Sequence, residues 1–189
     1  LKADLQIVVA FRMLPEVVWN MPPLGTYNLH GSLLPKYRGA APINWAVING
    51  ETESGVTSFK LKHEIDTGNM LFQETRPITK TTTAGELHDT LMQVGAEVIL
   101  KTVRAIESGN YEIKPQDDFQ SIHAPKLFKD TCKINWNNPA EKIYNLIRGL
   151  SPYPAAFTEF VDKNNQILGV KIFTSEIEET QHTYNTGDV

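Results

Sequence analysis

Short apolar runs alternate with amphipathic segments along the chain. The run at residues 5–10 is rich in β-branched side chains, which is typical of a parallel-sheet strand covered on both faces. Strands are expected at residues 5–10, 26–30, 56–61 and 70–74, and short helices at residues 15–20 and 43–48. Strands that alternate with helices at this spacing predict an α/β domain with a mostly parallel sheet.

One long helix follows the fourth strand. Thr83 and Glu86 have the spacing of a capping box, and apolar residues recur behind them at helical intervals. These apolar residues are Leu87, Leu91, Val94 and Val98. The pattern predicts an amphipathic helix to about Glu107, and Gly109 is expected to end it.

The periodicity is lost after this helix, and breakers such as Pro115 and Pro125 predict a linker at residues 110–137. Asn138 is expected to cap another helix that ends near Gly149. Residues 157–162 and 166–173 then suit a β-hairpin that opens a small β-domain. The chain is predicted to divide into an α/β part at residues 1–109, a linker at 110–137, and a connecting helix with the β-domain at 138–189.

Composition narrows the class of protein. Hydrophobic residues make up 41% and charged residues 21% of the 189 residues, so a folded core is expected. The net charge of -4 excludes a polybasic nucleic-acid sheath, although a local basic patch is compatible with it. Cys132, as the single cysteine, excludes an intrachain disulfide or a cysteine-based zinc site. The apolar runs are too short to span a membrane, and we expect a soluble cytoplasmic protein.

Candidate chemistry begins at the second strand. Asn28 and His30 lie two residues apart, so their side chains share one face near the end of the strand, where ligands bind in open α/β sheets. Asp66 lies in a later loop and is followed by Thr67 and Gly68. The alternative interpretation is a buried structural histidine, a turn asparagine and an ordinary Asp-Thr-Gly turn in which Gly68 takes positive φ.

If Asp66 folds back beside His30, the three side chains suit addition at a carbonyl carbon. Asn28 and His30 can donate to the developing oxyanion, and the charge of Asp66 favours the imidazolium form of His30. The glycine-containing loop at residues 31–42 lacks the spacing of phosphate-binding motifs. We expect it to shape a pocket rather than to bind a phosphate. The other histidines lack metal-ligand spacing, so no metal is expected.

The run at residues 28–43, NLHGSLLPKYRGAAPI, followed by Asp66-Thr67-Gly68, resembles the folate-dependent formyltransferases. The resemblance covers nearly the whole chain. It implies a partial Rossmann-like formyltransferase domain, a linker and the start of a small β-barrel domain, within a fragment that lacks the N-terminal part and most of the barrel. It also implies a catalytic set and a 10-formyltetrahydrofolate site. These are Asn28, His30 and Asp66, and Ser32, Leu33, Leu34 and Pro35.

Residues 39–43, 133–136 and 147–154 look most like the family members that act on methionyl-tRNA. This implies formyl transfer from 10-formyltetrahydrofolate to the amino group of initiator methionyl-tRNA in translation initiation, by a monomer when intact. The alternatives are N-formylation of an amino-sugar nucleotide, and a folate- or RNA-binding module without turnover. A basic face for tRNA, or equally a solvated charged surface, could be formed by Lys126, Lys129, Lys133, Lys142 and Arg148.

Overall fold

The computed structural model describes residues 2–10, 13–181, 183 and 185–186. Its strands are β1 Gln6–Val9, β2 Thr26–His30, β3 Arg38–Gly39, β4 Glu53–Lys60, β5 Met70–Pro77, β6 His123–Ala124, β7 Ala156–Val161 and β8 Ile167–Ile172. Its helices are α1 Glu16–Trp19, α2 Pro42–Ile48, α3 Ala84–Ser108 and α4 Ala140–Leu150, with 3₁₀ turns at Asp118–Gln120 and Asp130–Cys132. The expected α/β class is confirmed.

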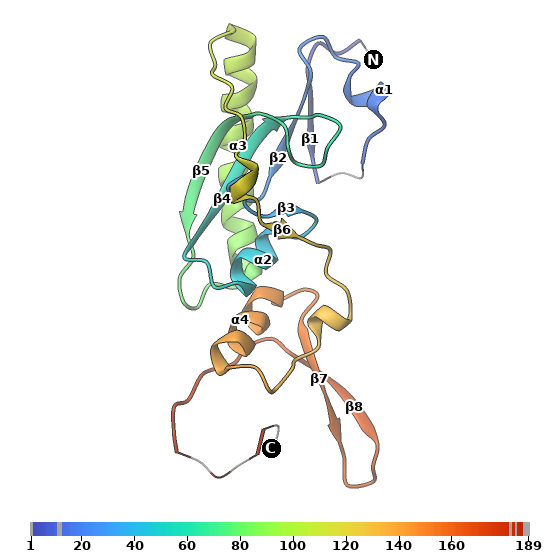
Figure 1. Cartoon of the computed structure of the whole chain (residues 1–189), viewed down its shortest axis with the longest axis vertical. Helices are drawn as coiled ribbons and strands as arrows, with labels where there is room; N and C mark the ends of the chain where they lie inside the picture. Colours follow the sequence, from blue (N-terminus) through green and yellow to red (C-terminus); the bar gives the residue numbers. More distant parts are fainter. Residues whose placement is uncertain (1, 11–12, 182, 184, 187–189) are drawn as a thin grey trace.

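The main sheet has the strand order β1-β2-β4-β5 (Figure 1). Only β1 and β2 pair in parallel, whereas β2–β4 and β4–β5 are antiparallel. The prediction of a mostly parallel sheet is therefore wrong for the described strands, and the sheet is mixed. The loop 61–69 between β4 and β5 holds no helix, and a parallel crossover needs a dozen or more residues.

Burial also differs from expectation at β1. This strand pairs only with β2 among the described strands, and Val9 at its end is 56% exposed. The neighbouring strand β2 is far more enclosed, with Tyr27, Asn28 and His30 all buried. The apolar run predicted the strand correctly, but its two-sided covering is not present within the described residues.

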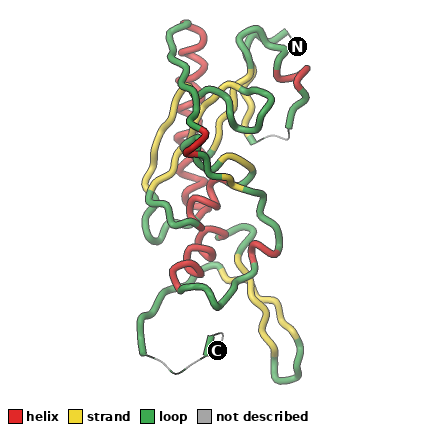
Figure 2. The backbone as a smooth tube through the Cα atoms, in the orientation of Figure 1, coloured by secondary structure: helices red, strands yellow, loops and turns green. Residues whose placement is uncertain are grey.

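Helix α3 lies across one face of the sheet (Figures 1 and 2). The predicted capping box is confirmed, because Thr83 Oγ1 accepts from the Glu86 N–H at 3.2 Å and Glu86 Oε2 accepts from the Thr83 N–H at 2.8 Å. Gly109 ends the helix in the left-handed conformation, with φ of 69°. The core beneath includes the predicted positions Leu87, Leu91, Val94 and Val98.

The segment 110–137 has little regular structure, yet it is bonded to the α/β part. Lys114 and Met70 exchange two backbone hydrogen bonds of 2.8 Å, and β6 pairs in parallel with β3. In Figure 2 the segment runs from the upper end of α3 down the molecule to α4. The division of the chain at 109 and 137 stays a prediction.

Helix α4 begins one residue later than expected. Pro139 occupies the N-cap position with ψ of 143°, outside the helical region, so Asn138 does not cap the helix. The Asn138 N–H instead donates to the Asn135 carbonyl at 3.0 Å. The hairpin of β7 and β8 follows within a residue of the predicted bounds and projects from the lower end of the molecule (Figure 1).

Arg148 joins α4 to the α/β part. Its side chain is buried and donates to Asn145 Oδ1 at 2.7 Å and to the Thr82 carbonyl at 2.8 Å. Burial lowers the pKa of this guanidinium. Arg148 is thus a structural residue, and its expected place on a basic surface is wrong. Within the described chain, no helix combines the length and the apolar character needed to cross a membrane.

Candidate active site

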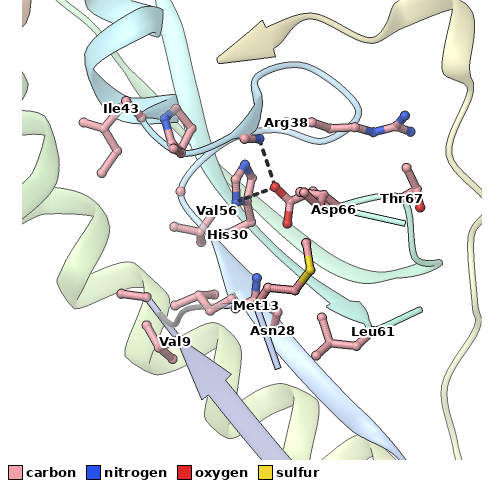
Figure 3. A pocket seen from close by; sticks show the side chains of 18 of the residues that line it. Val9, Met13, Asn28, His30, Arg38, Ile43, Val56, Leu61, Asp66 and Thr67 are labelled. Carbon is pink, nitrogen blue, oxygen red and sulfur yellow. Dashed lines mark hydrogen bonds and ion pairs between the residues drawn. The ribbon is translucent and has the colours of Figure 1, made fainter. Parts of the chain in front are cut away.

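Strand β2 delivers Asn28 and His30 to one cavity at its C-terminal end (Figure 3). The cavity has a volume of about 1420 Å³. The two side chains are two residues apart on an extended strand and therefore share a face, as expected. Both residues are buried. The loop between β4 and β5 brings Asp66 into the same cavity, so the three predicted catalytic residues converge.

Asp66 is held by the loop opposite. Its Oδ2 atom accepts the Gly39 N–H at 2.9 Å and lies 3.8 Å from His30 Nδ1 (Figure 3). The second distance is that of an ion pair rather than a direct hydrogen bond. Asp66 itself has a positive φ of 53°, whereas Gly68, for which positive φ was the alternative reading, does not. The negative charge therefore faces Nδ1 without binding it directly.

The His30 ring is oriented by other groups. His30 Nε2 lies 2.8 Å from the Tyr37 carbonyl oxygen, and the Phe59 ring meets the imidazole edge-on, with centroids 6.5 Å apart. Because a carbonyl only accepts hydrogen bonds, Nε2 carries the proton in the neutral ring. Nδ1 then holds the free lone pair beside Asp66. His30 is thus arranged to take up a proton at Nδ1.

Tyr37 is a site residue that sequence reasoning missed. It is buried with φ of 61°, and its hydroxyl donates to Glu51 Oε1 at 2.8 Å. Burial raises the pKa of Tyr37 to about 12, so the hydroxyl stays protonated. The contact with His30 is made by the Tyr37 backbone carbonyl, which every residue type possesses, and no sequence signal could have singled it out.

Asn28 supplies the polar amide of the cavity. The residue is 5% exposed, and its buried Oδ1 atom has no hydrogen-bond partner in the part of the chain that the structure describes. An unpaired amide oxygen in a buried position is costly unless a ligand satisfies it. Asn28 therefore fits a site that receives a polar group.

The predicted folate-binding stretch does not line the cavity. Ser32, Leu33, Leu34 and Pro35 are not among the residues that line it. Ser32 Oγ donates to the Lys36 carbonyl at 2.6 Å, and Thr57 Oγ1 links the Ser32 carbonyl to the Leu34 N–H. The stretch therefore supports the loop that carries Tyr37 and Gly39.

The cavity wall is mostly apolar away from Asn28, His30 and Asp66. Val9 and Met13 line one side, and Leu91 and Met92 of α3 contribute another. Polar side chains lie among the remaining lining residues, including Lys62, His63 and Lys126. Apolar walls with a few convergent polar groups are typical of small-molecule sites. No group of three potential metal ligands occurs among the residues that the structure describes.

Comparison with known proteins identifies the family. The family model described as formyl transferase matches residues 1–103. The chain belongs to the formyl transferase family. A second model, described as formyl transferase, C-terminal domain, matches residues 126–189. The resemblance of the NLHGSLLP run to formyltransferases is thereby confirmed.

Two relatives in this family match the chain over its whole length. The methionyl-tRNA formyltransferase of Bacteroides fragilis is 56% identical and that of Parabacteroides distasonis 54% identical, each over 100% of this chain. The chain spans about 60% of the length of the curated relatives it matches. Among solved structures, an N-formyltransferase of Helicobacter canadensis, in complex with folinic acid and dTDP-3-aminofucose, is 29% identical with a TM-score of 0.66. That match covers 84% of this chain and 57% of the other.

Proposed function

We propose that this formyltransferase chain carries the catalytic groups of an enzyme that transfers a formyl group from 10-formyltetrahydrofolate to the amino group of initiator methionyl-tRNA. The proposal is carried by the convergence of Asn28, His30 and Asp66 in one cavity. The names of the relatives that match the whole chain at 54–56% identity support the choice of substrate. Translation initiation would place the protein in the cytoplasm, and we propose a monomer.

The proposed roles follow from the geometry of the three side chains. As the neutral amine adds to the formyl carbon, His30 Nδ1 takes up the proton that the amine loses. The imidazolium then lies 3.8 Å from the Asp66 carboxylate, which stabilises its charge. Asn28 lines the cavity, and its Nδ2 group, at the other end of the amide from the unpaired Oδ1, donates to the oxygen that becomes negative. When the carbon–nitrogen bond to the leaving amine breaks, His30 returns its proton to that nitrogen.

The cavity supports binding of a folate as co-substrate. Its apolar walls suit a flat pterin ring, and about 1420 Å³ exceeds what one drug-sized ligand needs. We propose that Ser32, Leu33, Leu34 and Pro35 serve the folate site by holding the loop backbone. Their hydrogen bonds within the loop and their absence from the cavity lining support this indirect role.

A second candidate function is N-formylation of an amino-sugar nucleotide, which the likeness to the Helicobacter canadensis enzyme favours. The deciding assay presents the full-length protein with 10-formyltetrahydrofolate and either charged initiator tRNA or amino-sugar nucleotides. Formylation of the methionyl-tRNA alone supports the first function, and formylation of the sugar alone replaces it with the second. Folate binding with formylation of neither would make the chain a binding module.

Two exposed lysines of the segment 110–137 provide a test of tRNA binding. Lys126 and Lys129 form no ion pair with the residues that the structure describes, whereas Lys133 is paired with Glu159. Changing Lys126 and Lys129 together to glutamine is expected to weaken tRNA binding and to reduce the slope of log K against log salt by about two, since each lost phosphate contact removes about one released counterion. The measurement is tRNA affinity from low to moderate salt.

The matched control for this pair is Lys133→Gln, whose ammonium already has a carboxylate partner. It is expected to change the salt slope by less than half a unit, and formylation of a small amine should be unaffected in both the double variant and the control. An unchanged slope in the double variant would place the tRNA contacts elsewhere.

A further inference from the structure

Gln116 lies in the segment 110–137, outside the catalytic trio and the cavity lining. Its side chain makes four hydrogen bonds. Nε2 donates to the carbonyl oxygens of Asp66 at 2.8 Å and Gly68 at 2.7 Å. Oε1 accepts from Arg38 Nε at 2.9 Å and from the terminal nitrogen of Arg38 at 2.7 Å. Both amide hydrogens and both oxygen lone pairs are therefore in use.

These bonds connect the two loops that form the reacting centre. On one side Gln116 holds the backbone of Asp66, and on the other it holds Arg38. The residue after Arg38 is Gly39, whose N–H binds Asp66 Oδ2 at 2.9 Å. Gln116 thus binds the carbonyl of Asp66 directly. It also binds Arg38, in the loop whose Gly39 N–H binds the Asp66 carboxylate.

The same segment reinforces this connection through its backbone. The Arg38 N–H donates to the Ile122 carbonyl at 2.9 Å, and β6 pairs with β3 at Arg38 and Gly39. Arg38 also pairs with Asp118 at 2.7 Å, although that carboxylate is 80% exposed and contributes little. The segment 110–137, which the sequence predicts to be a linker, therefore holds the loops of Arg38 and Asp66 in place.

We propose that Gln116 is a positioning residue for formyl transfer that acts through Asp66, by setting the place of its carboxylate beside His30 Nδ1. The inference rests on the proposed function of the catalytic trio. Asp66 Oδ2 is 3.8 Å from Nδ1 and makes no direct hydrogen bond to it. The distance between the two side chains is therefore set by the loops that carry them. A shift of the loop by about 1 Å would weaken the support of the imidazolium and cost up to 10²-fold in rate.

Position 116 requires a side chain that donates two hydrogen bonds and accepts two, and the amide of glutamine does both. In Gln116→Glu the side chain keeps its shape and its bonds to Arg38, but the single nitrogen Nε2 that donates to both carbonyls becomes an oxygen atom, which faces the carbonyl oxygens of Asp66 and Gly68 without a hydrogen to donate. This variant removes two hydrogen bonds and adds a negative charge beside the two carbonyls. Gln116→Leu removes all four bonds.

The experiment compares Gln116→Glu and Gln116→Leu in the full-length protein, with Gln120→Leu as the matched control. Gln120 is an exposed glutamine of the same segment whose amide bonds only to Asp117. Both Gln116 variants are expected to lower kcat by roughly 10- to 30-fold, with the KM for 10-formyltetrahydrofolate changed little because Gln116 is outside the cavity. Gln116→Leu, which leaves the partners of four hydrogen bonds unpaired, should also lower the Tm. Gln120→Leu should retain the activity of the unchanged protein.

A double-variant cycle with Asp66→Asn separates positioning from general stability. If Gln116 acts through Asp66, adding Gln116→Glu to Asp66→Asn should lower kcat by less than about twofold more. Full additivity of the two losses, a loss confined to KM, or kcat within twofold of the unchanged protein for Gln116→Glu would overturn the inference. If the unchanged protein formylates no substrate, the proposed function fails instead, and the two failures are thus distinguished.

Discussion

Replacing His30 with alanine is expected to lower kcat for formylation by about 10²- to 10⁴-fold, the usual contribution of a general acid–base group. His30 Nδ1 is the basic atom that faces the cavity, because Nε2 is engaged with the Tyr37 carbonyl at 2.8 Å. The affinity for 10-formyltetrahydrofolate should change by less than about threefold, since the proton is transferred only in the reaction. Steady-state kinetics and a direct folate titration measure the two effects.

Asp66→Asn tests the charge beside His30 separately. The variant keeps a carbonyl oxygen able to accept the Gly39 N–H, and loses only the negative charge near Nδ1. It is expected to lower kcat less than His30→Ala does. Asp89→Asn is the control, an exposed aspartate paired with His88 on α3. Turnover of His30→Ala within twofold of the unchanged protein would remove His30 from the mechanism, and a loss confined to KM would make it a binding residue.

Gly68→Ala is expected to combine a loss of stability with a loss of turnover. A Cβ atom at this position would lie 1.7 Å from the Lys60 carbonyl oxygen, so the backbone of the loop must move. Overpacking of this kind costs about 1–3 kcal/mol of folding free energy. Since the same loop carries Asp66, a displacement of about 1 Å should also lower kcat by roughly 10²-fold. Denaturant unfolding and steady-state kinetics report the two effects.

Gly169→Ala is the matched control for this substitution. Gly169 lies in β8, and a Cβ there would meet nothing within 4 Å. Its free energy of unfolding should stay within about 0.5 kcal/mol of the unchanged protein. Equal behaviour of the two alanine variants would show that the loop at Gly68 has room that the structure does not indicate.

Local features of the sequence determined the elements and indicated the residues that we propose as the catalytic set. The capping box at Thr83 and Glu86, the apolar spacing behind it and the stop at Gly109 all act within a few residues of chain, so the sequence alone predicts α3 closely. The two-residue spacing of Asn28 and His30 likewise predicts that they share a face. Their resemblance to the formyltransferase motif then indicates Asp66 as the third member.

Tertiary structure decided how these residues are held and which others hold them. The direction of β4 and the amide of Gln116 at Asp66 depend on segments far apart in the chain, and the carbonyl of Tyr37 reaches His30 Nε2 only through the fold of the loop between them. Gln116 and Asp66 are separated by 50 positions, and Arg148 reaches Thr82 across 66. Such contacts leave no periodic or motif signal, because one partner is often a backbone carbonyl and the other an ordinary polar side chain. Only the folded chain shows that the predicted linker holds the loops of Arg38 and Asp66, and that Arg148, a candidate for a basic or solvated surface, is buried.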